Sequence, residues 1–381
     1  FLVGGRFYVG RTTKQQGYGT NGSDANFHYD PDSLKNSDYV FPGMNIALFA
    51  ENSFAVTKKL KIVPGVRYEY ISTLGNGGYR MTNATDNIVD TTLLYENRSY
   101  KRSFVLLGLG VSYDVWKQTE LYANFSQNYR GITFTDMRVQ GLAQRVDPNL
   151  RDEKGWNLDI GWRGNINHWF NFDASVYWLE YNNRIGQIQT VDSAYNIYVL
   201  TTNIGQSRSL GAELFAQADI FEAAKISKRA GHLVIYVTPS YTNAKYVKSN
   251  FQTVVGKFME FAPQVMLRGG ITYSYQSFST TISANFVSKQ YSDATNAERV
   301  PSAVTGAIPA YYVMDWNAKY SIKCLQFIAG INNFTNNIYF TRRATSYPGP
   351  GIIPAQPLTF YFTLGIKLNE KVKEKHFNTF Q

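Results

Sequence analysis

The sequence predicts an all-β protein, an antiparallel transmembrane β-barrel with about fourteen strands in this chain. Three observations support this prediction. Polar and apolar residues alternate in many segments, long and short connections between those segments alternate along the chain, and no apolar run is long enough for a membrane helix. Residues 358–368 alternate most clearly, with every second residue from Leu358 to Leu368 apolar. About ten alternating residues suffice for a tilted strand to cross a membrane.

Alternating segments recur along the whole chain. Trp156–Trp162 and Phe170–Trp178 each place apolar side chains at every second position, as a strand with one lipid-facing side does. The expected strands lie near 1–12, 44–57, 60–73, 102–116, 119–130, 155–165, 169–189, 197–222, 232–247, 257–276, 278–291, 309–322, 325–342 and 358–369.

The connections between these segments alternate in length. Long ones are expected at 13–43, 74–101, 131–154, 248–256, 292–308 and 343–357, and short ones at 58–59, 116–118, 165–168, 276–277 and 323–324. Two connections depart from this alternation. Connection 190–196 is short although it lies at the end with the long connections, and connection 222–231 is long although it lies at the end with the short ones. Long loops at one end and tight turns at the other are typical of outer-membrane barrels. With the long loops outside the cell, the C-terminus is periplasmic.

Composition narrows the class further. The 381 residues carry a net charge of +10, but the basic residues are scattered, which fits an anion-attracting lumen better than nucleic-acid binding. The mean hydropathy of −0.29 looks soluble, yet a membrane barrel keeps its apolar residues at alternate positions. The 28 tyrosines and 25 phenylalanines suit membrane interfaces, although a soluble sandwich can be as aromatic. The single Cys324 excludes a disulfide framework and a cysteine metal site.

The histidines do not indicate a metal site or an enzyme. They are far apart in sequence, whereas metal binding needs convergent ligands; they are His28, His168, His232 and His376. An outer-membrane hydrolase needs a histidine beside an acid or a serine. His28 with Asp30 and Asp32 is the one such candidate, but its segment reads as a loop. We therefore expect no catalytic residues and no metal ligands.

Four motifs, in the right order along the chain, resemble those of TonB-dependent outer-membrane receptors. They lie at 147–161, at 203–213, at 308–320 and at 331–339. Asp147 stands where the family usually has Asn, and Asp159 where it usually has Glu. The closing stretch, from Tyr339 to Pro354, resembles the ferric-citrate type, the iron(III) dicitrate transporters.

The resemblance implies a barrel of 22 strands, an N-terminal plug domain and a short box that binds TonB. Residues 1–369 would then be the C-terminal part of the barrel and 370–381 a charged tail, with the plug and the first strands absent. The tail departs from the family, whose members usually end on the last strand. Strand 358–368 should be an unpaired edge of an open sheet, or else close against residues 1–12.

The resemblance also implies a function. The protein would be an integral, monomeric receptor in the outer membrane of a Gram-negative bacterium, with no nucleic-acid partner. It would take up an anionic ferric siderophore, ferric citrate in the first place, and would meet the TonB complex through the missing N-terminal region. It would bind no cofactor itself, because the iron arrives already chelated by citrate or another siderophore.

Arginine is the residue type expected at such a site, because its paired N–H donors match carboxylates. Candidate ligand contacts flank one long loop or open the last one: Arg130, Arg138, Arg145, Arg342 and Arg343. Hydrogen bonds are expected from Gln140, Gln144 and Tyr347. The alternative is that these arginines pair with neighbouring acids or are solvated. A second set should form an interstrand network or contact the plug: Arg67, Glu69, Asp159, Arg163 and Asp173.

Other interpretations stay open at this level. A complete fourteen-stranded passive channel, such as a fatty-acid transporter, agrees with the strand count but not with the receptor motifs. A soluble β binding protein is the third interpretation, and partition into detergent-free buffer would support it. Vitamin, haem or sugar uptake is compatible with the same scaffold.

Overall fold

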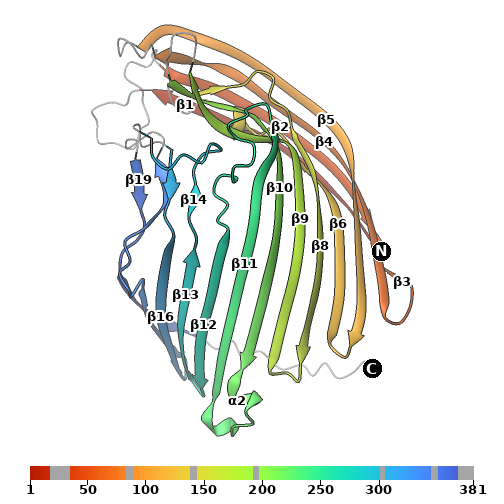
Figure 1. The fold of residues 1–381 in the computed structure, drawn as a ribbon, viewed down its shortest axis with the longest axis vertical. Helices are drawn as coiled ribbons and strands as arrows, with labels where there is room; N and C mark the ends of the chain where they lie inside the picture. The colour runs from red at the N-terminus through yellow and green to blue at the C-terminus, as the bar shows by residue number, and fades with distance from the viewer. Residues whose placement is uncertain are drawn as a thin grey trace.

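The computed structural model describes residues 1–17, 35–82, 89–137, 144–191, 197–300, 305–344 and 351–367. Long antiparallel strands lie side by side across the molecule (Figure 1). In these residues the main sheet runs in the order β1-β2-β4-β5-β6-β8-β9-β10-β11-β12-β13-β16-β17-β20, which confirms the predicted fourteen strands; β3 and β7 are attached beside it.

The strands of the first half of the sheet are β1 (Leu2–Gly17), β2 (Lys35–Glu51), β3 (Phe54–Ala55), β4 (Leu60–Thr82), β5 (Val89–Trp116), β6 (Thr119–Arg130), β7 (Gln144–Val146), β8 (Glu153–Ile166) and β9 (Phe170–Val191). The second half contains β10 (Ile197–Asp219), β11 (His232–Ser249), β12 (Val265–Tyr275), β13 (Phe278–Val287), β16 (Tyr311–Ile322), β17 (Leu325–Asn332) and β20 (Thr359–Ile366). Two small hairpins, β14 (Gln290–Tyr291) with β15 (Ala307–Ile308) and β18 (Phe340–Ala344) with β19 (Gly351–Pro354), belong to the long connections.

The helices are short. They are α1 (Phe134–Met137), α2 (Ile220–Ala223) and the 3₁₀ turn η1 (Lys228–Ala230). Within the described ranges, no helix is long and apolar enough to cross a membrane.

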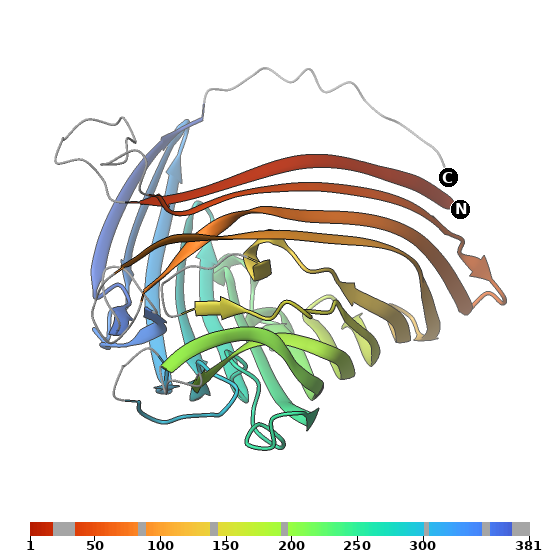
Figure 2. The same ribbon diagram turned by 90° about the horizontal axis from the view of Figure 1, so that it is seen from above.

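The sheet curls around a hollow without closing (Figure 2). Of the described strands, β1 pairs only with β2, and β20 pairs only with β17. The expectation that strand 358–368 is the edge of an open sheet is therefore confirmed, and the alternative closure against residues 1–12 is not found.

The outer face of the sheet is apolar and exposed, as the alternation predicted. Val176 on β9 is 56 % exposed, and Phe362 on β20 is 68 % exposed. Exposed apolar residues continue across most strands, an area far beyond the small patches that soluble monomers expose. This face is built for contact with lipid.

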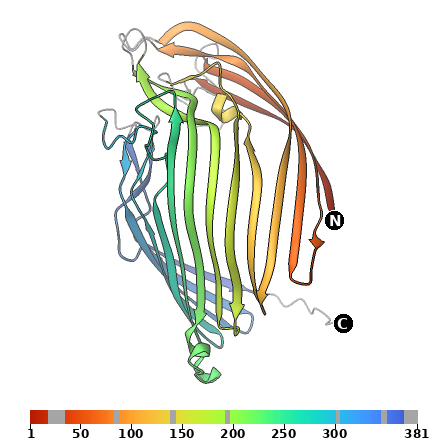
Figure 3. The same ribbon diagram turned by 45° about the vertical axis from the view of Figure 1, so that its right-hand side comes forward.

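The tight turns lie at one end of the strands and the long connections at the other (Figure 3). The turn residues Gln118, His168 and Gln276 have positive φ, as two- to three-residue reversals require.

Several predicted boundaries were wrong. β2 begins at Lys35, inside the connection expected at 13–43, β12 begins only at Val265, and β17 already ends at Asn332. Most of the connection expected at 74–101 is strand as well, because β4 and β5 pair up to Thr82↔Val89. Gly75, Asn76, Gly77 and Gly78 continue the ladder. The strands therefore extend well beyond the lipid-facing stripe.

Candidate functional site

The connection between β6 and β8 folds back into the hollow of the sheet. It carries α1 and β7, which lie inside the curve in Figure 2. β7 pairs in parallel with residues Val199–Thr201 of β10. β11 pairs with β10 only from Gly205 onward, so β7 takes its place beside the upper part of β10. The segment thus forms part of the wall at the end with the long connections, which we call the mouth.

A buried carboxylate anchors this segment. Glu153, at the start of β8, is fully buried and accepts hydrogen bonds from Arg130 Nη1 at 2.9 Å, Arg184 Nη1 at 2.8 Å and the Ile185 amide at 3.0 Å. Arg130 also donates to Asp136 of α1 at 2.6 Å. A buried charge is tolerated when its lone pairs are satisfied in this way. Two acids and two arginines form a locally neutral group.

A second carboxylate, that of Asp152, lies where the pairing of β5 with β6 ends. The β5–β6 ladder ends at Gly108↔Ser126, while β5 continues upward. Above that point Asp152 pairs with Arg102 at 2.9 Å and accepts from the Tyr129 hydroxyl at 2.5 Å and the Ile132 amide at 2.7 Å. These contacts fix both ends of the inserted segment.

Apolar side chains complete the anchoring of the segment. Buried residues from β2, the insertion and β9 pack together: Tyr39, Phe41, Ile132, Met137, Val146, Leu150 and Ile185. The Tyr39 and Phe41 rings are stacked, with centroids 5.4 Å apart. The mouth therefore contains a small core of its own, and the inserted segment is part of that core.

The first receptor-like motif is structural. Asp147 accepts from the Thr202 hydroxyl at 2.6 Å. Asn203 accepts from the Arg151 amide at 2.7 Å and donates to the carbonyls of Arg151 at 2.8 Å and Asn183 at 2.7 Å. These residues fasten the returning chain across β9 and β10.

The last motif is structural as well. Asn333, which is buried, donates its amide to Asp315 at 2.7 Å and its side chain to the Asn337 carbonyl at 2.9 Å. The rings of Tyr311 and Tyr339 stack beside it, with centroids 4.6 Å apart. The motif ties the turn after β17 to β16.

A second buried cluster lies under the connections after β11 and β13. It contains Ile188, Ile204, Tyr246, Val254 and Ala294. The Tyr246 hydroxyl donates to Glu260 at 2.7 Å. Burial raises the pKa of Glu260 above its ordinary value, although the bond from Tyr246 and the charge of Arg184 oppose the rise.

Four of the five predicted arginines lie within the described residues, at two places. Arg130 is held by Asp136 and Glu153, as the alternative interpretation expected. Arg145, on β7, lies over the Tyr198 ring at 4.1 Å. Arg342 is exposed on β18, and Arg343 beside it donates to the Ala307 carbonyl at 2.7 Å. Arg138, Gln140 and Tyr347 fall outside the described residues. Gln144 donates to the Thr201 hydroxyl at 3.3 Å.

Arg98 is a mouth residue that the sequence did not reveal. Its Nη2 donates to Glu96 at 2.7 Å, and its side chain is only 11 % exposed. Nη1 has no hydrogen-bond partner among the described residues. Such a buried, unsatisfied donor is costly unless something binds it. Arg98 was missed because residues 74–101 read as a loop.

The inner face of the strands carries the predicted interstrand network. Arg67 donates to Glu69 at 2.5 Å, and Glu69 also accepts from Asn45. On the next strands the pairs are Tyr122 with Asp173, Asn124 with Asp159, and Arg163 with Glu120. The network expected for these charges is confirmed. Contacts of the same residues to a plug stay a prediction.

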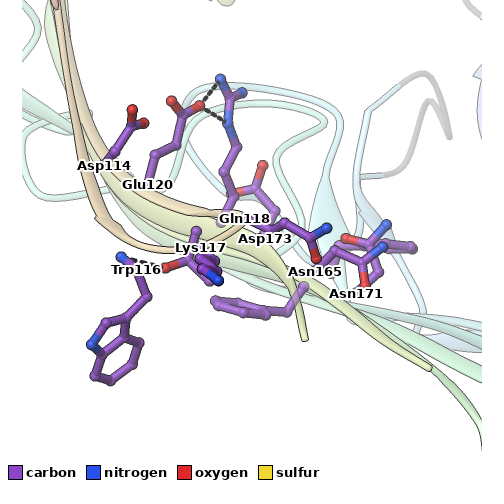
Figure 4. A pocket seen from close by; sticks show the side chains of 13 residues that line it. Asp114, Trp116, Lys117, Gln118, Glu120, Asn165, Asn171 and Asp173 are labelled. Atoms are coloured by element: carbon purple, nitrogen blue, oxygen red, sulfur yellow. Dashed lines mark hydrogen bonds and ion pairs between the residues drawn. The ribbon is translucent and has the colours of Figure 1, made fainter. Parts of the chain in front are cut away.

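The inner face has a hollow at the tight-turn end, opposite the mouth. A cavity of about 730 Å³ lies between the turns after β5 and β8, and Figure 4 shows Glu120, the ion-pair partner of Arg163, on one side of it. Asp114 and Asp173 bring two further carboxylates to this rim. A polar, partly acidic surface of this kind can receive another folded segment with basic groups.

Histidines do not converge in the described chain. His168 is a turn residue, and His28 and His376 lie outside the described residues. His232 contacts Asp219 at 2.6 Å. Asp219 also caps α2: burial alone would raise its pKa, but the bond from His232 and the amides of Phe221 and Glu222 lower it. Across the described ranges, no three potential ligands are grouped to hold a metal.

Comparisons with known proteins identify relatives of this architecture. The family described as TonB dependent receptor-like, beta-barrel matches residues 1–334. A comparison with curated proteins found no significant match.

Solved structures share the fold at low sequence identity. The ferric citrate transporter FecA superposes with a TM-score of 0.72 at 21 % identity, over 96 % of this chain and 50 % of that one. The copper transporter OprC superposes with a TM-score of 0.69 at 16 % identity, over 96 % of this chain and 54 % of that one. The ferric yersiniabactin receptor FyuA from Yersinia pestis superposes with a TM-score of 0.68 at 14 % identity, over 88 % of this chain and 47 % of that one. The chain spans about half the length of each.

Proposed function

The chain belongs to the TonB-dependent receptor β-barrel family, and we propose that it forms part of the barrel wall of an outer-membrane receptor that takes up a ferric siderophore. The family consists of transporters rather than enzymes, in keeping with the expectation of no catalytic residues. The similar structures include carriers of ferric citrate, ferric yersiniabactin and copper, so the fold alone does not select the substrate.

The observation that carries the proposal is the inserted segment at the mouth. It places Arg145 next to Val146, and the Val146 carbonyl accepts a 3.5 Å hydrogen bond from Arg98 Nη2, so that the two arginines lie in the same part of the mouth. Arg98 Nη1 lacks a partner in the described chain, which favours an acceptor that comes from outside. A carboxylate-rich anion supplies such acceptors. The mouth is therefore suited to ferric citrate.

We propose Arg138, Arg145, Arg342 and Arg343 as ligand contacts, with Arg98 added, and Arg130 as the residue that positions the inserted segment for them. Arg145 and Arg342 are the strongest of these, because the inserted segment carries the guanidinium of Arg145 into the hollow over an aromatic ring and Arg342 is exposed. Arg130 would serve by holding the segment in place, since two carboxylates already occupy it. The iron would arrive chelated, and the chain would supply no metal ligand.

The rest of the receptor is proposed from the fold. Residues 1–369 would be barrel wall and 370–381 a tail with a periplasmic end. Further strands would cover the edges of β1 and β20, because an open ladder is prone to mispairing. A plug would rest on the charged inner face, and TonB would act on that plug in a monomeric receptor. The open sheet disfavours the alternative of a complete fourteen-stranded channel.

Binding of radiolabelled ferric citrate to the full-length protein tests the site. Arg145→Gln and Arg342→Gln should each weaken binding about tenfold, since one charge-assisted hydrogen bond contributes about 1.5–3 kcal/mol. Arg229→Gln, an exposed arginine in η1 at the opposite end, is the matched control. Unchanged affinity in both mouth variants would sink the site. Binding of copper or a neutral siderophore, with none of ferric citrate, would show that the substrate is wrong.

A further inference from the structure

The connection between β10 and β11, at the tight-turn end, is a folded element of its own. It occupies residues 220–231, whereas the reversals after β8 and β12 need only 167–169 and 276–277. Its helix α2 projects beyond the ends of the strands (Figure 1). We call residues 220–231 the α2–η1 loop. Asp219 caps α2 by accepting from the amides of Phe221 at 3.1 Å and Glu222 at 3.2 Å. Ser227 caps η1 by accepting from the Arg229 amide at 3.3 Å, so the loop has a defined structure.

Contacts with β11 and β12 hold the α2–η1 loop in one position. The Phe221 ring meets the Tyr273 ring edge to face, with centroids 6.3 Å apart. The Tyr273 hydroxyl donates to the Ala230 carbonyl at 3.1 Å. His232, the first residue of β11, contacts Asp219 at 2.6 Å and so joins the two ends of the loop. The side chains on the loop are therefore presented from a fixed backbone.

Three cations lie on the α2–η1 loop without an acid partner. Lys225, Lys228 and Arg229 are exposed, and none of their side chains forms an ion pair or a hydrogen bond in the part of the chain that the structure describes. Glu222 is the one acid within the loop, and the carboxylate of Asp219 is occupied by the α2 cap and His232. The loop therefore presents a positive surface that can attract anions.

A cavity of about 490 Å³ lies where the α2–η1 loop meets the next turn. Its lining includes Lys228, Arg229, His232, Ser274, Tyr275 and Gln276. His232 and Ser274 are directly opposite each other in the β11–β12 ladder. Three residues further along, Ile235 and Ile271 are the opposed pair, and they are 40 % and 49 % exposed on the apolar outer face. Because side chains alternate between the faces of a strand, His232 and Ser274 lie on the hollow side of the wall, away from lipid.

The chemistry of this cavity fits a small anionic group better than a protein surface. Stable protein interfaces bury about 800 Å² on each partner around an apolar centre. The loop offers no such centre, because Ile226 is its one exposed large apolar side chain. The lysine and arginine N–H groups match carboxylates, Ser274 and Gln276 can bond hydroxyl and amide groups, and Tyr275 adds a ring that is 38 % exposed. Peptidoglycan combines these partners, since its short peptides end in free carboxylates and are joined to amino sugars.

We propose that the α2–η1 loop binds the peptide carboxylates of peptidoglycan. One carboxylate would lie between Lys228 and Arg229, Lys225 would attract a second one, and a sugar would lie near Tyr275. A single contact of this kind is weak, but the polymer repeats its carboxylates and so keeps their local concentration high. The inference rests on the proposed location in the outer membrane with the tight turns in the periplasm. It concerns none of the residues at the mouth.

Co-sedimentation with purified cell-wall sacculi tests the proposal on the full-length protein in detergent, with no siderophore present. Native sacculi are compared with sacculi whose carboxylates have been amidated. The wild type should bind the native sacculi at least about tenfold more tightly, because amidation removes the charge-assisted hydrogen bonds. The triple variant Lys225→Gln, Lys228→Gln, Arg229→Gln should lose that difference. The triple variant Lys58→Gln, Lys59→Gln, Lys323→Gln removes three exposed charges from other turns at the same end and should keep it.

The outcomes separate this inference from the receptor proposal. Equal binding of the two preparations by the wild type, an unchanged difference in the loop variant, or an equal loss in the control variant overturns the peptidoglycan site. Poly-glutamate that displaces the protein from sacculi more strongly than a soluble disaccharide–tetrapeptide does would identify an acidic protein segment as the occupant instead. A protein that prefers native sacculi but binds no ferric siderophore contradicts only the receptor proposal. A protein that stays folded in detergent-free buffer contradicts the membrane location on which both rest.

Discussion

Replacement of Glu153 by glutamine should release the inserted segment of the mouth. The glutamine side chain can still accept from the Ile185 amide, and Arg130 keeps its bond to Asp136. The main loss is the charged bond to Arg184, whose side chain is 32 % exposed and can partly rehydrate. A hydrogen bond to a charged group contributes about 1.5–3 kcal/mol, so the discounted local cost is about 2 kcal/mol.

Hydrogen exchange of residues 144–153 in the full-length protein measures that cost. An increase in opening of about thirtyfold corresponds to about 2 kcal/mol. Glu120→Gln is the control, because the Glu120–Arg163 pair is more exposed and should contribute less than about 1 kcal/mol. Equal effects of the two substitutions on their own segments would refute the argument that burial makes the Glu153 group strong. A double-mutant cycle with Arg184→Met isolates the pair.

Three further predictions concern local structure. Glu260 has a raised pKa, so its contribution to stability is present at low pH and is lost as the pH rises through the raised value; the opening equilibrium of residues 250–264, obtained from exchange rates divided by the intrinsic rate at each pH, should increase from pH 5 to pH 8, and Glu260→Gln should remove that increase. Asp219 has a lowered pKa, so its stabilisation is present above 3.8 and is lost as the pH falls through the lowered value; Asp219→Ala should cost about 1 kcal/mol at pH 7, measured as the opening equilibrium of residues 219–232 by exchange, and the cost should shrink as the pH falls below 3.8. Asn203→Ala removes three hydrogen bonds and should expose the chain near Arg151 to protease, whereas Asn182→Ala, at an exposed site, should not.

The lipid-facing half of the fold was predictable from the sequence. Contact with lipid forces every second residue of a strand to be apolar, and this rule is visible in Trp156–Trp162 without any structure. The count of fourteen strands and the free edge at Leu358–Leu368 follow from the same rule and from loop lengths.

The mouth was less predictable because its strands have protein or water on both sides. Residues 74–82 and 89–101 lack an alternating pattern for that reason, although they belong to the paired strands β4 and β5. The parallel pairing of β7 with β10 joins Gln144 to Val199, and no local signal specifies such a distant partner. Arg130 shows what the sequence leaves undetermined. The sequence places this arginine beside a loop, but only the fold shows that it pairs with Asp136 and Glu153.

The strand order has a consequence for the time course of assembly. Each strand of the main sheet pairs with the next main-sheet strand along the chain, and of the described strands only β3, β7 and the hairpins β14–β15 and β18–β19 lie off this path. The wall can therefore grow one hairpin after another with little loss of chain entropy. The β7–β10 contact spans more than fifty residues and needs β8 and β9 to be in place before its partner is presented. The mouth should therefore form last. An intermediate that accumulates during assembly would have the strands of the main sheet paired but the inserted segment not yet docked at the mouth.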